Sequence, residues 1–133
     1  IVAVAFVISL SSCSEENEQA SKEQTPEATE FSNIDIKTAY DRAEELLRIG
    51  EEMVSLYNSG KVDQCMGLFK KHHMRTRELR DAVETKFPKQ YITLGASLGH
   101  MINCTSCADS KDQCKLAKEF LEETNKLHKF SSK

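Results

Sequence analysis

The sequence predicts an all-α protein: an antiparallel four-helix bundle stapled by disulfides and preceded by a disordered acidic tether. Three observations predict this fold. Apolar residues recur at alternating spacings of three and four, the period of a helix that packs along a neighbour. The 133 residues include only two Pro and five Gly, too few for the frequent turns of a β-sandwich or barrel. Four of the five Cys lie after residue 33 and can form two disulfides.

The first helix is expected from about residue 35 to residue 58. Its apolar positions alternate at spacings of four and three: Ile36, Tyr40, Ala43, Leu47, Gly50, Val54 and Tyr57. Asn33 or Asp35 can cap its start, because a side-chain oxygen there accepts from the free backbone amides of the first turn. Gly60 can end the helix in the left-handed conformation that glycine adopts without a steric penalty.

The second helix is expected over about 61–86. It stops at Phe87 because the following Pro88 disfavours the helical conformation of the residue before it. Its expected inward residues are Val62, Cys65, Met66, Phe69, Leu79, Ala82 and Val83. A short connection to the first helix makes the two antiparallel.

Two further amphipathic helices complete the predicted bundle. The third covers about 89–103, with Tyr91, Ile92, Leu94, Leu98, Met101 and Ile102 inward. The fourth begins near Asp109 or Ser110, with Cys114, Ala117, Phe120, Leu121, Thr124 and Leu127 inward. Gly95 and Gly99, four residues apart on the third helix, suggest a flat surface on which another helix of the bundle packs closely.

The helix layout constrains the pairing of Cys65, Cys104, Cys107 and Cys114. Counting 1.5 Å per residue away from the turn at residues 87–88 places Cys65 about 9 Å beyond Cys104 along the bundle. That gap is too long for a direct disulfide in ideal geometry, whereas Cys107 can close it. We therefore favour Cys65–Cys107 with Cys104–Cys114, and keep Cys65–Cys104 with Cys107–Cys114 as the alternative. A local Cys104–Cys107 bond is the least expected, since it constrains almost nothing.

The start of the chain carries a targeting pattern. Residues 1–12 read IVAVAFVISLSS, an uncharged apolar run that matches the hydrophobic region of a secretory signal and is too short to span a bilayer. A few residues, including a Met and a Lys or Arg, are expected before Ile1. The run ends in Leu10-Ser11-Ser12-Cys13, which resembles the lipobox of bacterial lipoproteins. The resemblance implies that diacylglycerol is attached to the Cys13 sulfur before the signal is removed.

Residues 13–32 are expected to form the lipidated cysteine and its tether. Residues 14–30 carry six Glu, one Lys and no large apolar side chain, so they cannot bury enough surface to offset the entropy of ordering. The helical domain is then 33–133. By resemblance to lipoproteins, the protein is held in the bacterial cell envelope facing the periplasm or the exterior. Because Ser14 rather than Asp follows the anchor, the outer membrane is favoured.

Charge narrows the range of partners. The whole chain has a formal net charge of −3, which argues against a general nucleic-acid binder. Most of the acidic excess lies in the tether, and the helical part is near neutral. A basic cluster on the second helix can meet an anionic lipid or an acidic protein, or can be an ordinary solvated face: Lys70, Lys71, Arg75, Arg77 and Arg80. Lys70 and Arg77 share one face of that helix, whereas Lys71 and Arg75 share another.

Metal, haem and redox chemistry have weak support. His72-His73-Met74 contains good ligands for copper or haem, but adjacent residues point about 100° apart on a helix. No second His lies four residues from either, and His100 and His128 stand alone in the sequence. Cys104-Thr-Ser-Cys107 lacks the following His of covalent haem attachment and the context of a thioredoxin-like site. We expect no cofactor and no metal, and the four cysteines are better explained as disulfides.

No catalytic set is recognisable, because the sequence has no nucleophile elbow and no phosphate-binding glycine loop. We therefore expect a membrane-anchored, non-enzymatic module that binds or inhibits a protein partner in the envelope. The chain resembles, in a general way, small exported helical lipoproteins, which include effector-immunity proteins and plasmid exclusion proteins. The alternative is a carrier that binds haem or a metal ion inside the bundle.

Overall fold

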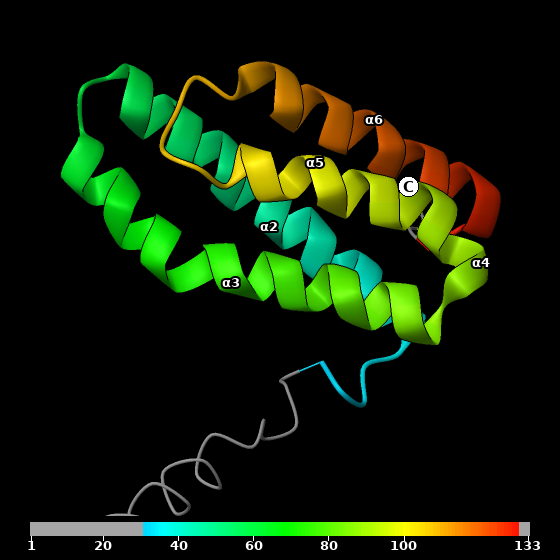
Figure 1. The fold of residues 1–133 in the computed structure, drawn as a ribbon. Coiled ribbons are helices and arrows are strands. Elements are labelled where there is room, and N and C mark those ends of the chain that lie inside the picture. The colour runs from blue at the N-terminus through cyan, green and yellow to red at the C-terminus, as the bar shows by residue number, and fades with distance from the viewer. Residues whose placement is uncertain (1–30, 131–133) are drawn as a thin grey trace, which may run out of the picture.

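The structure, a computed structural model, describes residues 31–130, and these form the predicted all-α bundle. Its elements are α2 (Ile36–Asn58), α3 (Val62–Lys86), α4 (Pro88–Gln90), η1 (Tyr91–Gly95), α5 (Ala96–Cys104) and α6 (Lys111–His128). The short α4, the π-helical η1 and α5 follow one another as a single helical run. Together with α2, α3 and α6 this run forms an antiparallel four-helix bundle (Figure 1). The described residues contain no strand. The predicted signal segment, 1–12, and residues 13–30 of the predicted tether lie outside them.

The two ends of α2 follow the local sequence. Asp35 is the N-cap, and its side-chain Oδ1 accepts a hydrogen bond of 2.8 Å from the backbone amide of Thr38. This hydrogen bond also lowers the pKa of the Asp35 carboxyl. After Asn58 the chain turns at Gly60, whose φ of 77° is the left-handed conformation predicted for it. The start and end of the first helix are thus determined locally.

The first turns of α3 are more exposed than predicted. Val62 is 43% exposed and Met66 36% exposed, so the expectation that both point into the core is wrong. The buried residues of α3 are Cys65, Thr76, Leu79 and Val83. The antiparallel α5 ends at Cys104, and on this side the start of α3 faces the α5–α6 loop, to which Cys65 is bonded through Cys107. A loop covers less of a helix than a second helix does.

The third helical run contains a feature that the sequence did not predict. Between α4 and α5 the chain forms the π-helical turn η1. A π-helical turn contains one residue more than an α-helical turn, so the side chains that follow are rotated about the helix axis relative to a continuous α-helix. Ile92 is 76% exposed, contrary to expectation, while Leu94 and Leu98 are fully buried.

Gly95 and Gly99 do not provide the close helix contact predicted from their spacing. A Cβ atom at Gly95 would meet the ring of Tyr91, which belongs to the same helical run. A Cβ atom at Gly99 would have no neighbour within 4 Å. Gly99 therefore lies on an open part of the surface, because no other helix approaches α5 at this point.

The last turn of α6 extends past the well-packed core. Leu127 is 59% exposed, so its predicted inward position is wrong. Lys129 closes the helix in the left-handed conformation, and the chain then folds back so that the Phe130 ring lies 5.3 Å from the ring of Tyr40. Phe130, rather than Leu127, packs against the core at this end of the bundle.

One hydrophobic core joins all four helices. It includes Ala39, Ala43 and Leu46 of α2, Leu79 and Val83 of α3, Leu94 of η1, Leu98 and Met101 of α5, and Ala117 and Leu121 of α6. Phe31 also belongs to it and is only 2% exposed. Phe31, the first described residue, is therefore packed with the helices.

Candidate functional site

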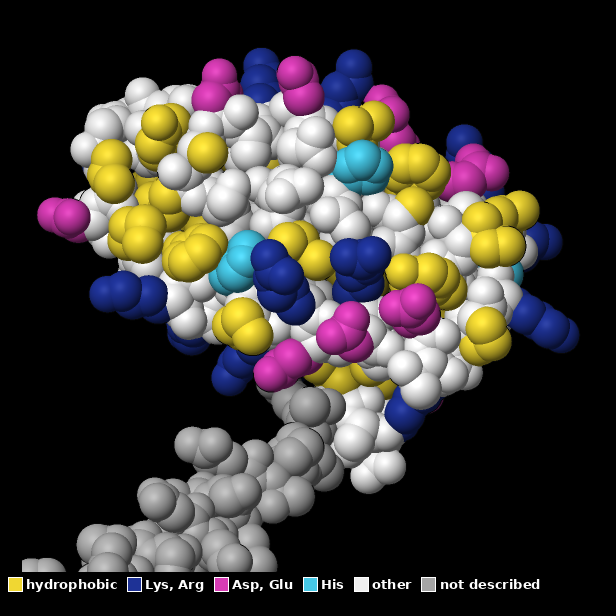
Figure 2. Space-filling model, viewed as in Figure 1, with side chains coloured by type: hydrophobic (Ala, Val, Ile, Leu, Met, Phe, Trp, Pro, Cys, Tyr) yellow, Lys and Arg dark blue, Asp and Glu magenta, His cyan; other side chains and the backbone are white. Residues whose placement is uncertain are grey.

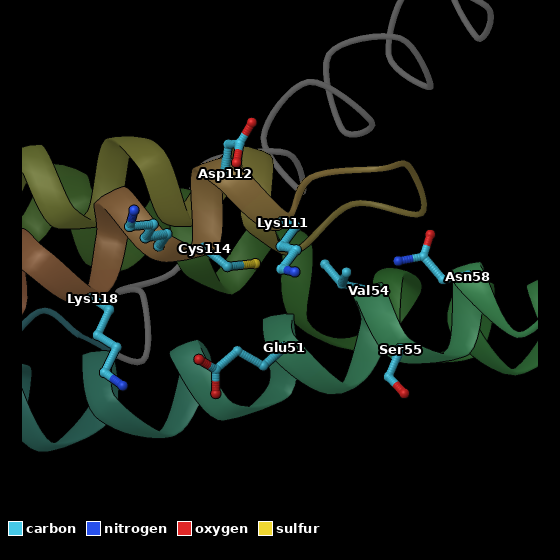
Figure 3. A pocket seen from close by; sticks show the side chains of 9 residues that line it. Glu51, Val54, Ser55, Asn58, Lys111, Asp112, Cys114 and Lys118 are labelled. Atoms are coloured by element: carbon cyan, nitrogen blue, oxygen red, sulfur yellow. The ribbon is translucent and has the colours of Figure 1, made fainter.

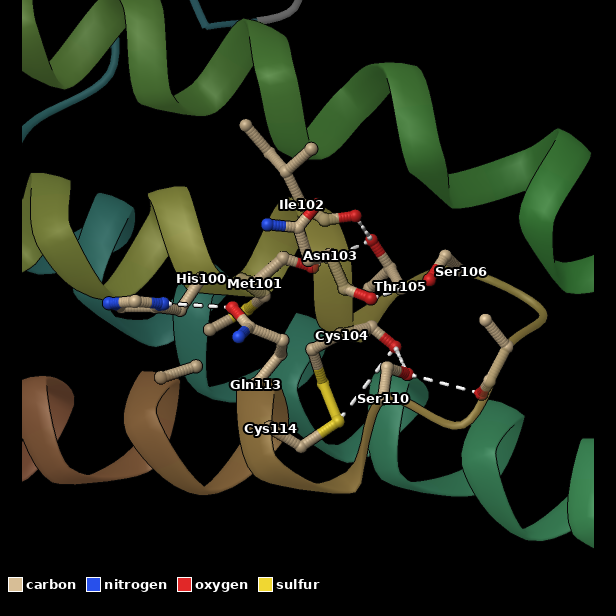
Figure 4. Close-up of a disulfide and its surroundings, with 12 residues drawn as sticks. His100, Met101, Ile102, Asn103, Cys104, Thr105, Ser106, Ser110, Gln113 and Cys114 are labelled. Atoms are coloured by element: carbon tan, nitrogen blue, oxygen red, sulfur yellow. Dashed lines mark hydrogen bonds between the residues drawn. A yellow bond between two sulfur atoms is a disulfide. The ribbon is translucent and has the colours of Figure 1, made fainter.

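Two disulfides meet at the corner where α3 begins, α5 ends and α6 begins, and Figure 4 shows the one between Cys104 and Cys114. Cys65 is bonded to Cys107, with 5.9 Å between their Cα atoms, and Cys104 is bonded to Cys114, with 4.7 Å between theirs. This is the pairing favoured from the helix layout. The first bond attaches α3 to the α5–α6 loop, and the second joins the end of α5 to the start of α6.

The loop between α5 and α6 is also held by hydrogen bonds from its own side chains. The buried Thr105 Oγ1 donates to the Met101 carbonyl at 2.9 Å, and Ser106 Oγ donates to the Asn103 carbonyl at 2.5 Å. Ser110 Oγ lies 3.4 Å from the Cys104 carbonyl oxygen (Figure 4). The Met101 carbonyl also accepts from the backbone amide of Thr105 at 2.8 Å, whereas the Asn103 and Cys104 carbonyls belong to the last turn of α5, whose carbonyls lack partners farther along the helix. The corner is therefore rigid.

A continuous row of side chains follows the flank of α3 that faces α5. We call it the α3 row, and it consists of Val62, Met66, Phe69, His73, Arg77 and Arg80. Their spacings of three and four place them along one side of the helix. Figure 2 shows this face of the molecule, with hydrophobic side chains gathered near the start of α3 and Lys and Arg side chains farther along it. The row thus changes from apolar to basic along its length.

His73 joins the apolar and basic parts of the α3 row. Its ring stacks on Phe69, with 4.4 Å between the ring centroids. Arg77 Nε donates to His73 Nε2 at 3.2 Å. Nδ1 in turn lies 3.4 Å from the carbonyl oxygen of Thr105 in the α5–α6 loop. The imidazole therefore connects α3 to the disulfide corner.

The five basic residues predicted as a cluster are divided between two flanks of α3. Lys71 and Arg75 lie on the flank facing α2, where they line a cavity of about 180 Å³ with Phe31, Arg42, Glu45 and His72. Arg77 and Arg80 belong to the α3 row, and Lys70 is exposed beside them. Burial, followed by the charges of Lys71 and Arg75, lowers the pKa of His72. No single basic surface contains all five residues.

A second groove, which the sequence analysis did not identify, lies between α2 and α6 (Figure 3). It has a volume of about 520 Å³, and Lys111, Lys115 and Lys118 line it from α6. Glu51 and Val54 line it from α2. Figure 3 shows Lys111 pointing toward α2 and Asp112 pointing away from it. The spacing of the three lysines is the only sequence signal for this groove, and it is common on solvated helices.

The described histidines have separate environments. His100 Nδ1 lies 2.9 Å from Gln113 Oε1, and its ring stacks on Phe120. His128 stacks on Phe130 at the end of α6. Within residues 31–130 there is no group of three or more His, Cys, Asp or Glu that could hold a metal ion. The four cysteines of this part are all in disulfides.

The anchoring residue proposed from the sequence, Cys13, lies outside the described residues. Among the helices that are described, none is both long and apolar enough to cross a membrane. The geometry of residues 31–130 thus defines a disulfide-stapled helical bundle with an exposed row on α3. Comparison of the chain with models of protein families, with curated proteins and with solved structures finds no match.

Proposed function

We propose that this protein is a lipid-anchored envelope protein that binds, and thereby inhibits, a protein partner through the apolar half of the α3 row. The observation that carries the proposal is the exposure of Val62 and Met66 at the disulfide corner. The role is the one suggested by the general resemblance to immunity proteins and plasmid exclusion proteins.

The composition of the α3 row suits a protein interface. Methionine, aromatic residues and arginine are enriched at such interfaces, and charged residues surround an apolar centre. Met66 and Phe69 supply the apolar part, and Arg77 is the adjacent charge. Tyr57, 36% exposed near the end of α2, adds a further aromatic side chain at the same end of the bundle.

Rigidity of the corner favours binding. Binding costs less conformational entropy when the surface that the partner contacts is already ordered. Cys65 is bonded to Cys107 directly beside Met66, and His73 is held by Phe69, Arg77 and Thr105. The side chains of the row are therefore presented in one arrangement.

The proposed anchor leaves this flank accessible. The described chain begins at Phe31, which is packed over the opposite flank of α3, among Leu46 of α2 and His72 and Arg75 of α3. A lipid on Cys13 would hold the domain through a tether that reaches the bundle on that flank. The α3 row, on the other flank, faces away from where the tether joins.

Site-specific photocrosslinking of the full chain in the native envelope tests this proposal. A photoreactive residue at Met66 should give one discrete crosslinked species, and the substitution Val62→Glu should remove it. The same photoreactive residue at Lys126, exposed on α6, is the matched control and should give none. Equal crosslinking from Met66 and Lys126, or a stoichiometric haem or metal ion in the purified protein, would contradict the proposal.

A further inference from the structure

A shallow groove continues from the basic end of the α3 row across α5. It has a volume of about 550 Å³ and is lined by Arg80 of α3, Tyr91 and Ile92 of η1, and Gly99, His100 and Asn103 of α5. It lies on the face shown in Figure 2. Arg80 follows Arg77 by three residues on the same flank of α3, so the groove adjoins the surface proposed to meet a partner.

The guanidinium of Arg80 has an unmet hydrogen-bonding requirement. A side-chain hydrogen bond with Tyr91 holds one part of the group and is the main reason that the pKa of Arg80 is raised. Its Nε is buried and has no hydrogen-bond partner within residues 31–130. Arg80 as a whole is only half-buried and lines the groove, so guanidinium N–H groups other than Nε can donate to an acceptor bound there.

The floor of the groove allows a ligand to approach. Gly99 and Ala96 present almost no side chain there, and a Cβ atom at Gly99 would meet nothing within 4 Å. His100 is fixed by its contact with Gln113 Oε1 at 2.9 Å (Figure 4). The amide groups of Gln113 and Asn103 add hydrogen-bond donors along the same wall.

We propose that this groove binds the side-chain carboxylate of an acidic residue that is flanked by an apolar residue in the partner protein. A carboxylate accepts from a guanidinium in a plane, and its single charge matches the single cation, Arg80, that lines the groove. Ile92, 76% exposed at the edge, gives an apolar neighbour a surface to pack on. This inference rests on the proposed function, since it names the chemistry of the same partner.

Nuclear magnetic resonance of the ¹⁵N-labelled, oxidised full chain in detergent micelles tests the inference. Burial makes the Arg80 Nε–H group observable, and its resonance reports directly on an acceptor. The peptide acetyl-Leu-Glu-amide should shift the resonances of Arg80 Nε–H and the Gly99 amide in a saturable way. The peptide acetyl-Leu-Gln-amide, which lacks only the charge, should bind at least tenfold more weakly.

Variants on the two sides of the groove provide the controls. Arg80→Gln should abolish binding of the Glu peptide, and Gly99→Leu should do so by filling the floor without removing a charge. Lys118→Gln, which removes a cation on the other side of the bundle, should leave binding unchanged. Equal binding of the Glu and Gln peptides, or unchanged binding to both groove variants, would overturn the inference.

Two further outcomes distinguish related ideas. If acetyl-leucine with a free carboxylate bound but acetyl-Leu-Glu-amide did not, the assignment to an acidic side chain would be wrong. If the photocrosslink at Met66 formed and neither peptide bound, the carboxylate inference would fail and the proposed function would stand. If the Glu peptide bound and no crosslink formed, the groove would stand and the partner surface at Met66 would fail.

Discussion

The backbone of Gly50 in α2 lies directly against the sulfur of Cys104 in α5. A Cβ atom built at Gly50 would collide with Cys104 Sγ and would also press on the Cys104 carbonyl group. Cys104 is fully buried and bonded to Cys114, so its sulfur cannot move aside. The absence of a side chain at residue 50 therefore lets α2 pack against the second disulfide.

Gly50→Ala should destabilise the fold despite the better helix propensity of alanine. Overpacking of a rigid core typically costs about 1–3 kcal/mol in the free energy of unfolding. Gly67→Ala is the matched control, because Gly67 is also inside a helix and a Cβ atom there meets nothing within 4 Å. The control should gain about 0.5–1 kcal/mol. Urea unfolding compares them, and a stabilised Gly50→Ala variant would disprove the contact.

Peptide mapping without reduction should recover Cys65 joined to Cys107 and Cys104 joined to Cys114. Both pairs have Cα separations within the range that a disulfide spans, at 5.9 Å and 4.7 Å. Mass spectrometry of proteolytic fragments identifies the joined peptides. Fragments joining Cys104 to Cys107 would refute both the pairing and the placement of the α5–α6 loop.

Removal of the disulfide that closes the longer loop should lower the free energy of unfolding of this small domain substantially. The bond between Cys65 and Cys107 closes a loop with a sequence separation of 42, and the bond between Cys104 and Cys114 one of 10. In the chain-entropy model these loops correspond to about 4 and about 3 kcal/mol. The double variant Cys65→Ala/Cys107→Ala should lose about 4 kcal/mol in urea unfolding. A loss below about 1 kcal/mol would mean that the bond barely restricts the unfolded chain.

The stability of the bundle should fall as the pH drops below the ordinary histidine pKa of 6.5, in part because of His72. Burial and the cations Lys71 and Arg75 lower the folded-state pKa, an effect that Glu45 opposes and Arg42 reinforces. Below pH 6.5 the unfolded chain therefore binds more protons than the folded one, and protonation favours unfolding. Stability from this group is present above pH 6.5 and is lost as the pH falls through the lowered pKa.

Urea midpoints at pH 7.5 and pH 5 measure this effect. Between the two, His72→Gln should lose less stability than the unmodified protein, and Lys71→Gln should show an intermediate loss because one repelling charge is gone. Identical losses for all three proteins would show that His72 does not contribute to the pH dependence.

Cys13 should carry the lipid anchor. Metabolic labelling with a palmitate analogue should mark the unmodified protein and leave Cys13→Ala unlabelled, because the Cys13 thiol is the proposed acceptor of the lipid. The Cys13→Ala protein should also be absent from the membrane fraction after cell fractionation. Equal labelling of the two proteins would end the lipoprotein proposal.

Sequence reasoning succeeded where the information is local or follows from length along a helix. Asp35 caps α2 and Gly60 ends the α2–α3 turn because each depends on the conformation of a few adjacent residues. The disulfide pairing followed from counting helical rise on the two sides of residues 87–88. The division of Lys70 and Arg77 from Lys71 and Arg75 followed from helical periodicity alone.

What the sequence by itself determined was therefore the number, direction and caps of the helices, and the level at which their cysteines meet. Only the tertiary structure decided which side chains are covered. Val62 and Met66 are exposed where the α5–α6 loop, rather than α5, lies opposite the start of α3, and Ile92 is exposed in the same turn as the buried Leu94. The unpaired Nε of Arg80 and the lysine groove of α6 likewise exist only once neighbouring helices are in place. Helical periodicity records which residues share a face, but burial depends on what stands opposite that face, and no local pattern encodes that.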